Sequence, residues 1–159
     1  MSYSLKSIII NPISKEKPES AVILCHGYGG DGKDISILAN YWKNFLPKTI
    51  FICPDAPEKC SISPSGYQWF ELGEYSEDQI LAKSLVSEVK LNKLIDEVKE
   101  KNNISANKIV LSGFSQGCMI SLQTGIKRKD KINCILGYSG RIISPNYLGK
   151  NINSRPNVM

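Results

Sequence analysis

A short glycine-flanked serine stretch carries the residue types of covalent catalysis. Gly113-Phe114-Ser115-Gln116-Gly117 forms a G-x-S-x-G pattern, in which a serine on a strained turn presents its hydroxyl as a nucleophile. Glycines are needed on either side because the segments before and after the turn pass close together. Free amide groups at the start of a following helix would face a negatively charged oxygen formed there. The stretch therefore predicts Ser115 as a nucleophile that Gly113 and Gly117 support.

The segments beside this stretch fit the strand, turn and helix that the pattern requires. Ile109, Val110 and Leu111 form a short apolar run before it, typical of a buried strand. A G-x-S-x-G pattern arises by chance in roughly one chain in twenty of this size, but chance does not supply matching flanks. The sequence therefore predicts a nucleophile elbow. After it, apolar residues recur at helical spacing and basic residues occupy the predicted last turn: Met119, Ile120, Leu122, Ile126, Lys127, Arg128 and Lys129.

The rest of the sequence alternates buried strands with amphipathic helices. Continuous apolar runs, typical of strands covered on both faces, occupy residues 21–25, 49–53 and 132–136. Helical spacing predicts helices from Asp34 to about Leu46 and from Asp78 to Lys101. This order predicts an α/β fold with a mostly parallel sheet and helices on both faces. We also expect an edge strand at residues 8–10, a loop-like segment at 141–159, and the start of one more strand at Val158-Met159.

The segments that follow the strands are expected to meet at one edge of the sheet, because ligands of parallel sheets bind beyond the carboxyl ends of the strands. These segments are residues 26–32, 54–77 and 137–140, together with the elbow. Residues 54–77 form a long loop with three prolines and two glycines. A loop of this length in a compact domain is usually functional. Its aromatic residues are Tyr67, Trp69, Phe70 and Tyr75.

Composition and charge argue against several classes of function. The 159 residues are 42% hydrophobic and suffice for one domain. The net charge is +5, but the basic residues are scattered along the sequence, and this scatter disfavours nucleic-acid binding. Five cysteines without regular spacing indicate reduced thiols and a cytoplasmic location, with Cys25 and Cys118 as small apolar filler. A single His cannot complete a metal site. We expect neither a signal peptide nor a membrane-spanning segment.

A second glycine-rich stretch offers a competing interpretation. Residues 27–32 read G-x-G-x-x-G after a strand, and Asp55 lies near where a ribose-binding acid occurs in dinucleotide-binding folds. Three features oppose this interpretation. The next helix is predicted to be capped only at Asp34, Asp55 lies between prolines in a loop, and the elbow is left unexplained. Dinucleotide binding therefore stays a distant alternative.

Five stretches together resemble the phospholipase/carboxylesterase family of α/β-hydrolases, which includes acyl-protein thioesterases and small bacterial carboxylesterases. They are HGYGGDGKD, CPDAP, GYQWFELG, GFSQGCM and GYSG, in the family's order and spacing from about residue 17 to residue 159. The resemblance implies a three-layer α/β-hydrolase fold and hydrolysis of carboxylic esters, thioesters or lysophospholipids through an acyl-enzyme. It implies no metal and no organic cofactor.

The resemblance also implies roles for individual residues. Ser115 is similar to the family's nucleophile, and the backbone amides of Tyr28 and Gln116 are similar to its two oxyanion-hole donors. His26-Gly27 matches a structural part of the oxyanion loop and not the catalytic base. Trp69 resembles the wall of an acyl site, although plain core packing explains an aromatic residue there equally well.

The chain departs from the family in the other two catalytic residues, an Asp and a His that follow the nucleophile in that order. Ser115 is followed by no His and by one acid, Asp130, which the predicted helix carries roughly 18 Å toward the opposite edge of the sheet. Asp130 is therefore expected to be a solvated loop acid. His26 is the single imidazole, but its place on the oxyanion side disfavours it as a makeshift base.

Two functional hypotheses follow from this departure. In the first, the sequence is a C-terminally truncated hydrolase without the last strands and helix, and Ser115 is fully active only when the missing Asp and His are supplied. In the second, it is a non-catalytic remnant of such a hydrolase. Both predict negligible hydrolysis by this chain alone. Both also leave the strand at residues 132–136 as an unpaired apolar edge, which predicts self-association.

Overall fold

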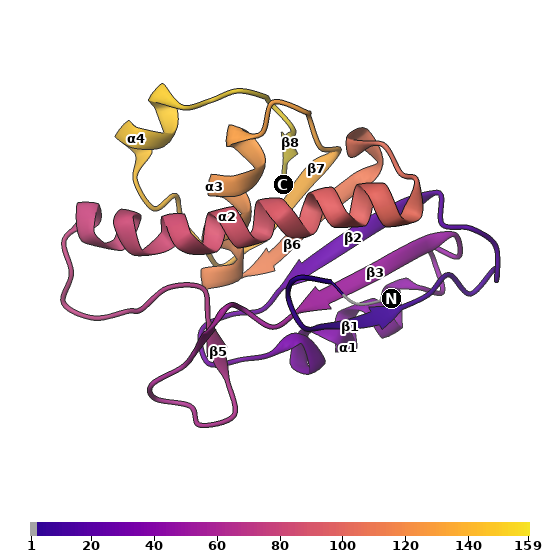
Figure 1. Cartoon of the computed structure of the whole chain (residues 1–159), viewed down its shortest axis with the longest axis horizontal. Helices are drawn as coiled ribbons and strands as arrows, with labels where there is room; N and C mark the ends of the chain where they lie inside the picture. The colour runs from indigo at the N-terminus through magenta and orange to yellow at the C-terminus, as the bar shows by residue number, and fades with distance from the viewer. Residues whose placement is uncertain (1–2) are drawn as a thin grey trace.

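A computed structural model describes residues 3–159 of the chain (Figure 1). At its centre lies a six-stranded sheet with the strand order β1-β3-β2-β6-β7-β8. All neighbouring pairs are parallel except β1 and β3, which are antiparallel, so the predicted sheet and its edge strand are confirmed. The strands are β1 (Ser7–Ile10), β2 (Ser20–Cys25), β3 (Thr49–Pro54), β6 (Ile109–Phe114), β7 (Cys134–Tyr138) and β8 (Asn157–Val158).

Helices cover both faces of this sheet, as the alternation of strands and helices predicts. Helix α1 (Gly32–Trp42) covers one face, and α2 (Glu77–Asn102) and α3 (Gln116–Lys127) cover the other (Figure 1). Their side chains form two separate apolar clusters with the sheet. Two short helices, η1 (Ala106–Lys108) and α4 (Pro145–Lys150), precede β6 and β8. The result is a three-layer arrangement with the sheet in the middle.

The central strand β2 shows why the apolar runs form buried strands. Its side chains alternate between two cores: Ala21, Ile23 and Cys25 face the cluster under α2 and α3, whereas Val22 and Leu24 face the cluster under α1. Each of these side chains is at most 5% exposed. A strand between two helical layers is buried on both faces and therefore needs a continuous apolar run. This burial fixes the carboxyl end of β2 in the middle of the sheet.

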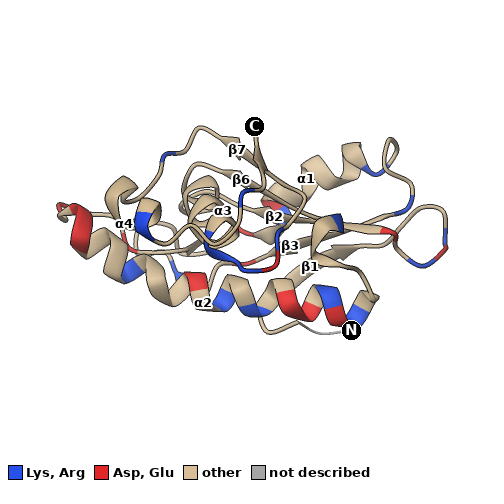
Figure 2. Cartoon of the chain, turned by 90° about the horizontal axis from the view of Figure 1, so that it is seen from above, with Lys and Arg blue, Asp and Glu red and all other residues tan. Residues whose placement is uncertain are grey.

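The long helix α2 has clear signals at both ends. The Ser76 hydroxyl accepts a hydrogen bond from the Gln79 amide, and the Gln79 side chain accepts one from the Ser76 amide, which is a capping box. Asn103 ends the helix in the left-handed region, with φ of 53°. Basic and acidic residues are interspersed along α2 (Figure 2), in keeping with the scattered charge in the sequence. The apolar side chains that it buries completely are Leu91, Leu94, Ile95 and Val98.

Several predicted boundaries were wrong. Helix α1 begins at Gly32 instead of Asp34, because the Asp31 carboxylate accepts a hydrogen bond of 2.8 Å from the Asp34 amide and so caps the helix earlier. It ends at Trp42, four residues before the predicted Leu46. The segment 141–159, expected to be loop-like, contains α4, in which the Ser144 side chain caps the first turn and a proline follows it.

The predicted unpaired edge at β7 was also wrong. Strand β8 pairs with it in parallel, with Cys134 opposite Asn157 and Ile135 opposite Val158. Met159 extends this pairing, since its amide donates to the Ile135 carbonyl and its carbonyl accepts from Gly137. The expected strand start at Val158 is therefore confirmed, and it covers β7. No strand within residues 3–159 pairs with the outer side of β8.

The long loop between β3 and α2 contains a small hairpin that sequence reasoning missed. Its strands are β4 (Glu58–Lys59) and β5 (Tyr67–Gln68), paired antiparallel. Two-residue strands give no periodic pattern, so the sequence alone does not reveal them. The hairpin lies beside the loop after β2, as the hydrogen bonds described below show.

Candidate active site

The serine at the end of β6 occupies a strained backbone conformation. Ser115 has φ of 51° and ψ of −114° and stands at the start of α3. Such a conformation is rare for a residue with a side chain, costs about 1–3 kcal/mol, and recurs at functional sites. The Ser115 amide donates to the Tyr138 carbonyl over 2.8 Å, which ties the turn to the end of β7. The residue is half-buried, and its hydroxyl makes no hydrogen bond within residues 3–159.

The two glycines of the elbow lie where no side chain fits. A Cβ on Gly113 would stand 2.3 Å from the carbonyl carbon of Gly117. A Cβ on Gly117 would stand 2.1 Å from the Cys25 carbonyl oxygen and 2.6 Å from that of His26. Strand β6, helix α3 and the end of β2 therefore touch backbone to backbone at this point. This contact brings Ser115 next to the segment that follows β2.

That segment, residues 26–31, is the loop between β2 and α1 and carries the predicted residues His26, Gly27 and Tyr28. Strand β2 pairs with β6 in register, Cys25 opposite Gly113, so the loop and the elbow leave the sheet side by side. The strand order reverses direction between these two strands, which is where α/β sheets bind ligands. The amides of Tyr28 and Gln116 have no acceptor in the described part of the chain. The structure thus brings Ser115 and both predicted donors to one place.

The 26–31 loop is held from outside by the β4–β5 hairpin. The Gly29 amide donates to the Tyr67 carbonyl over 2.9 Å, and the Tyr67 amide donates to the Gly30 carbonyl over 2.8 Å. The Ser63 hydroxyl donates to the Gly29 carbonyl. A Cβ on Gly66 would stand 2.0 Å from the Gly29 oxygen, so the two backbones are in contact. This part of the long loop therefore shapes the loop that carries Tyr28.

The imidazole of His26 is fully used by its own surroundings. Its Nε2 accepts a hydrogen bond of 3.0 Å from the Ala56 amide, so Nδ1 carries the proton and donates to the Gly27 carbonyl over 2.7 Å. The side chain is buried, and this burial lowers the pKa of His26, although Gly27 and Asp55 act in the opposite direction. Neither nitrogen is left to receive the Ser115 proton. His26 holds the loop and does not act as a base here.

Trp69 lies in the core and not on a substrate wall. Its side chain has no exposed surface. The indole N–H donates to the His26 carbonyl over 3.0 Å, and the ring lies 5.8 Å from the His26 ring, centroid to centroid. The prediction that Trp69 forms the wall of an acyl site is therefore wrong for this structure. The alternative interpretation, core packing, describes the residue, because a buried indole needs a hydrogen-bond acceptor and finds one here.

The side chain of Gln116 makes contacts that sequence reasoning missed. It is 1% exposed, its Oε1 accepts from the Trp69 amide over 2.8 Å, and its Nε2 donates to the Phe70 carbonyl over 2.6 Å. The sequence pointed only to its backbone amide. One signal for these contacts was available. A long polar side chain occupies the first turn of the helix and faces the core beside a buried aromatic loop.

Asp130 is remote from the elbow, as predicted, but it is not simply solvated. Its carboxylate pairs with Arg128 over 2.7 Å and with Lys99 over 2.5 Å, near the far end of α2. Partial burial raises the pKa of Asp130, but the bonds to Arg128 and Lys99 outweigh it and leave the pKa below its usual range. The residue therefore stabilises the contact between α2 and the end of α3.

The dinucleotide interpretation fails on the start of α1. The glycines do lie at the amino end of that helix, so the predicted late cap at Asp34 was not a valid objection. The place for a pyrophosphate is instead taken by the protein's own carboxylates. Asp31 caps the helix, and Asp55 accepts the Gly32 amide over 2.9 Å and pairs with Lys6 over 3.1 Å. Two carboxylates there would repel a phosphate.

Apolar hollows adjoin the elbow on the α1 side of the sheet. One of about 240 Å³ is lined by His26, Gly27, Tyr28, Gly30, Asp34, Ile35 and Phe114. A second of about 360 Å³ is lined by Ile35, Leu38, Trp42, Phe114, Tyr138 and Ser139. They share Ile35 and Phe114 and are therefore neighbours, and Phe114 directly precedes Ser115. An apolar surface at this place suits the hydrocarbon part of a ligand.

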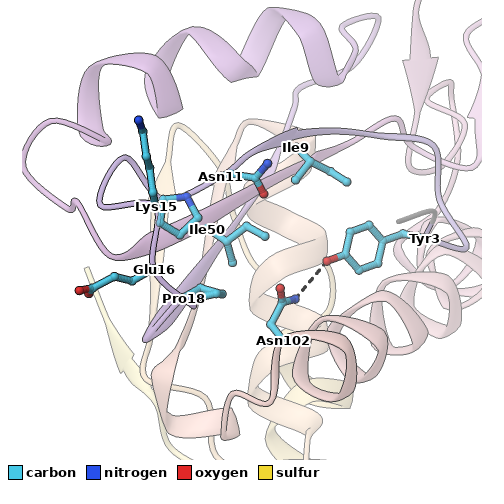
Figure 3. Close-up of a pocket in the computed structure, with 9 residues that line it drawn as sticks. Tyr3, Ile9, Asn11, Lys15, Glu16, Pro18, Ile50 and Asn102 are labelled. Atoms are coloured by element: carbon cyan, nitrogen blue, oxygen red, sulfur yellow. Dashed lines mark hydrogen bonds between the residues drawn. The ribbon is translucent and has the colours of Figure 1, made fainter.

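A larger cavity, of about 480 Å³, lies at the opposite edge of the sheet and away from Ser115. It is lined by residues of the segment before β2, which includes β1, by the start of β3 and by the end of α2 (Figure 3). One side is closed by the Asn102 side chain, which donates to the Tyr3 hydroxyl over 3.1 Å. Its lining includes no residue of the elbow or of the 26–31 loop, so volume alone does not identify the site of chemistry.

The remaining reactive side chains are also accounted for. The five cysteines are unpaired and buried, and burial raises the pKa of Cys25 and of Cys53 to about 12, so these thiols stay protonated. Across residues 3–159, no group of three or more His, Cys, Asp or Glu side chains could hold a metal ion. None of the described helices combines the length and the apolar character needed to cross a membrane.

Known proteins resemble this chain in sequence and in fold. Residues 6–158 match the model of the phospholipase/carboxylesterase family. Acyl-protein thioesterase 1 of Schizosaccharomyces pombe is 34% identical over 146 residues, covering 88% of this chain and 63% of the relative. The crystal structure of esterase PE8 superposes with a TM-score of 0.92 at 33% identity, covering 97% of this chain and 72% of that one.

A more distant structure agrees in fold. Acyl-protein thioesterase 2 of Zea mays has a TM-score of 0.63 at 19% identity and covers 95% of this chain. The chain spans about 63% of the length of the curated relatives from Schizosaccharomyces pombe and Yarrowia lipolytica that it matches.

Proposed function

The chain belongs to the phospholipase/carboxylesterase family, and from that membership we propose that Ser115 is the nucleophile for hydrolysis of carboxylic esters or thioesters. The observation that carries the proposal is the strained conformation of Ser115. Within residues 3–159 its hydroxyl makes no hydrogen bond, and the amides of Tyr28 and Gln116 beside it have no acceptor. Strain of this kind clusters at functional sites, and here it lies next to unused donors. It suits an oxygen that attacks a carbonyl.

The proposed reaction proceeds through an acyl-enzyme. The Ser115 oxygen adds to the acyl carbonyl as its proton passes to a base, and the amides of Tyr28 and Gln116 donate to the resulting oxyanion. The carbonyl then reforms as the alcohol or thiol leaves with a proton. Water attacks the acyl-enzyme in the same way and releases the acid and the free Ser115.

The base is the part of this mechanism for which the described residues 3–159 offer no group. The chain has one His, and both nitrogens of His26 are bound elsewhere. Asp130 is engaged by Arg128 and Lys99. We therefore expect the proton acceptor to come from a group outside these residues, on the same polypeptide or on a second one. The same observation supports the alternative function, a non-catalytic relative that keeps the elbow without the chemistry.

The substrate is proposed from the surface beside the elbow. Ile35, Leu38, Trp42 and Phe114 offer apolar contact to an acyl chain, so long-chain esters, thioesters and lysophospholipids are candidates. Reduced, buried cysteines support a cytoplasmic location.

Fluorophosphonate labelling with chemical rescue tests the proposed function. The Ser115 oxygen forms a bond to phosphorus, the P–F bond breaks, and the proton goes to the base, which added imidazole can provide. We expect slow labelling of the 159-residue chain, clear acceleration by imidazole, and loss of labelling in Ser115→Ala. Ser105→Ala, at an exposed position, serves as the control. Nitrophenyl ester hydrolysis without imidazole should be negligible.

The result also separates the two candidate functions. Labelling at Ser115 that imidazole accelerates supports a functional oxyanion site that lacks only its base. Labelling no faster than that of exposed serines, with or without imidazole, supports the non-catalytic alternative. Ester turnover at ordinary enzyme rates without any addition, abolished by Ser115→Ala, would show that a base within the chain had been overlooked.

A further inference from the structure

A chain of buried hydrogen bonds joins the elbow to the 26–31 loop through a third segment. The Gln116 side chain accepts from the Trp69 amide and donates to the Phe70 carbonyl, at 2.8 and 2.6 Å. The Trp69 indole in turn donates to the His26 carbonyl at 3.0 Å. Gln116 is 1% exposed and Trp69 is fully buried, so water does not compete for these bonds. We call these bonds between Gln116, Trp69, Phe70 and His26 the bridge. The Ser87 hydroxyl donates to the Trp69 carbonyl and so anchors the bridge to α2.

Both ends of this bridge adjoin a proposed oxyanion donor. One end is the side chain of Gln116, whose own amide is a donor. The other is the His26 carbonyl, two residues before the Tyr28 amide. The direct contact of Gly117 with the Cys25 and His26 carbonyls prevents the two segments from approaching further, but it does not keep them together. The pairing of β2 with β6 holds the segments together as far as Cys25 and Gly113, and the bridge adds attraction beyond the end of that pairing.

We propose that the side chains of Gln116 and Trp69 are positioning residues that set the separation between the Tyr28 and Gln116 amides. The proposal rests on the proposed function, which assigns these amides as oxyanion donors. Donors of this kind act fully only when they are held within about 0.5 Å of the productive geometry. Neither side chain touches substrate, because both are buried. Their effect is on the stabilisation of the oxyanion and not on substrate binding.

Gln116→Met in the 159-residue chain tests this proposal. Methionine keeps the length of the side chain but leaves the Trp69 amide and the Phe70 carbonyl without partners. Gln123→Met is the matched control, because Gln123 is 4% exposed on the same helix and bonds Ser84 and Glu88, away from the elbow. The measurement is imidazole-assisted phosphonylation of Ser115, resolved into the maximal rate and the half-saturating concentration of a fluorophosphonate. Circular dichroism and urea unfolding confirm that each variant is folded.

We expect the maximal rate to fall at least tenfold in Gln116→Met, with the half-saturating concentration within twofold of the parent. Gln123→Met should keep both values within twofold despite a similar loss of stability. Trp69→Phe removes the indole bond to the His26 carbonyl and some buried volume but keeps the backbone bonds to Gln116. It should also lower the maximal rate, and it replaces Gln116→Met if that variant does not fold. Exchange of the Trp69 indole proton, with the Trp42 indole as internal reference, should accelerate in Gln116→Met.

The outcomes separate the two proposals. Equal maximal rates in Gln116→Met and Gln123→Met, with the parent clearly labelled at Ser115, overturn the positioning role and leave the proposed function intact. A parent that is not labelled above Ser115→Ala overturns the proposed function, and the positioning role with it. An unchanged Trp69 indole exchange in Gln116→Met would show that the bridge does not hold the tryptophan.

Discussion

At the residue scale, the site is built by contacts between backbones that leave no room for a Cβ. Gly117 touches the Cys25 and His26 carbonyls, Gly113 touches Gly117, and Ser115 takes the strained conformation between them. The strain persists because packing on both sides allows no other path for the chain. The packing of the neighbouring residues therefore exposes the nucleophile, and the backbone preference of serine does not.

Gly117→Ala is expected to destabilise the chain by about 3 kcal/mol, because its Cβ would stand 2.1 Å from the Cys25 oxygen and force the backbones apart. Gly149→Ala is the control, since no atom lies within 4 Å of a Cβ there. That change in α4 should stabilise by up to about 1 kcal/mol. Urea unfolding measures both. A Gly117→Ala chain as stable as the parent would show that the three segments are not in contact.

His26 predicts a pH dependence of stability. Burial lowers its pKa in the folded chain, whereas the unfolded chain takes up a proton near the ordinary value of about 6.5. The stabilisation is therefore complete above that pH and is lost as the pH falls toward the lower folded value. We expect the unfolding free energy to decrease more steeply from pH 7 to pH 5 in the parent than in His26→Gln. Identical slopes would mean that the imidazole is not buried neutral.

At the element scale, α2 and α3 are joined by a buried polar cluster as well as by apolar packing. Lys127 pairs with Glu88 over 2.8 Å, with side chains only 12% and 10% exposed. Gln123 and the Tyr147 hydroxyl complete the set of partners. Helix α3 begins at Gln116, directly after the elbow, and this cluster holds the later turns of the helix against α2.

Lys127→Met is expected to cost about 3 kcal/mol, because it leaves the buried Glu88 carboxylate without its counter-charge. Lys48→Met is the control and should cost less than about 1 kcal/mol, since Lys48 pairs with Glu19 at the surface, 48% and 65% exposed. Urea unfolding compares them. The double change Lys127→Met with Glu88→Leu should recover part of the loss. Equal costs at the two lysines would contradict the burial of this pair.

At the scale of the whole molecule, the outer edge of the sheet is short and apolar. Val158 and Met159 are 52% and 71% exposed, and the α1 side of β6 and β7 carries the half-exposed Phe114 and Tyr138. Hydrogen bonds to β7 come from the amides of Asn157 and Met159, so the Val158 amide points outward. An outward amide beside exposed apolar side chains favours pairing with another copy.

Self-association through β8 is therefore the expected behaviour of the 159-residue chain in solution. Val158→Pro removes the outward donor without removing a bond to β7, and it should shift the chain toward monomer. Light scattering during size-exclusion chromatography, over a range of concentrations, measures the shift. Leu72→Ser, which removes an exposed apolar side chain elsewhere, is the control. A parent that stays monomeric at all concentrations would contradict this prediction.

The elements that follow from local patterns were predictable, and the contacts between distant segments were not. Apolar runs located β2, β3 and β6, and helical spacing located α2 and α3, because each depends on residues close together in the chain. The burial of Trp69 was left open, and the bond between its amide and the Gln116 side chain joins residues 47 apart. Strand β8 was recognised only at Val158, because two residues show no period.

The sequence by itself determined the layered sheet, the turn that carries Ser115 and the absence of a second imidazole, since these depend on periodicity, on glycine spacing and on counting. Only the tertiary structure decided that His26 is occupied, that Trp69 is interior and that Gln116 links the elbow to the loop before Tyr28. The physical reason is that hydrogen bonds assign a side chain its role, and their partners come from segments that folding alone brings together.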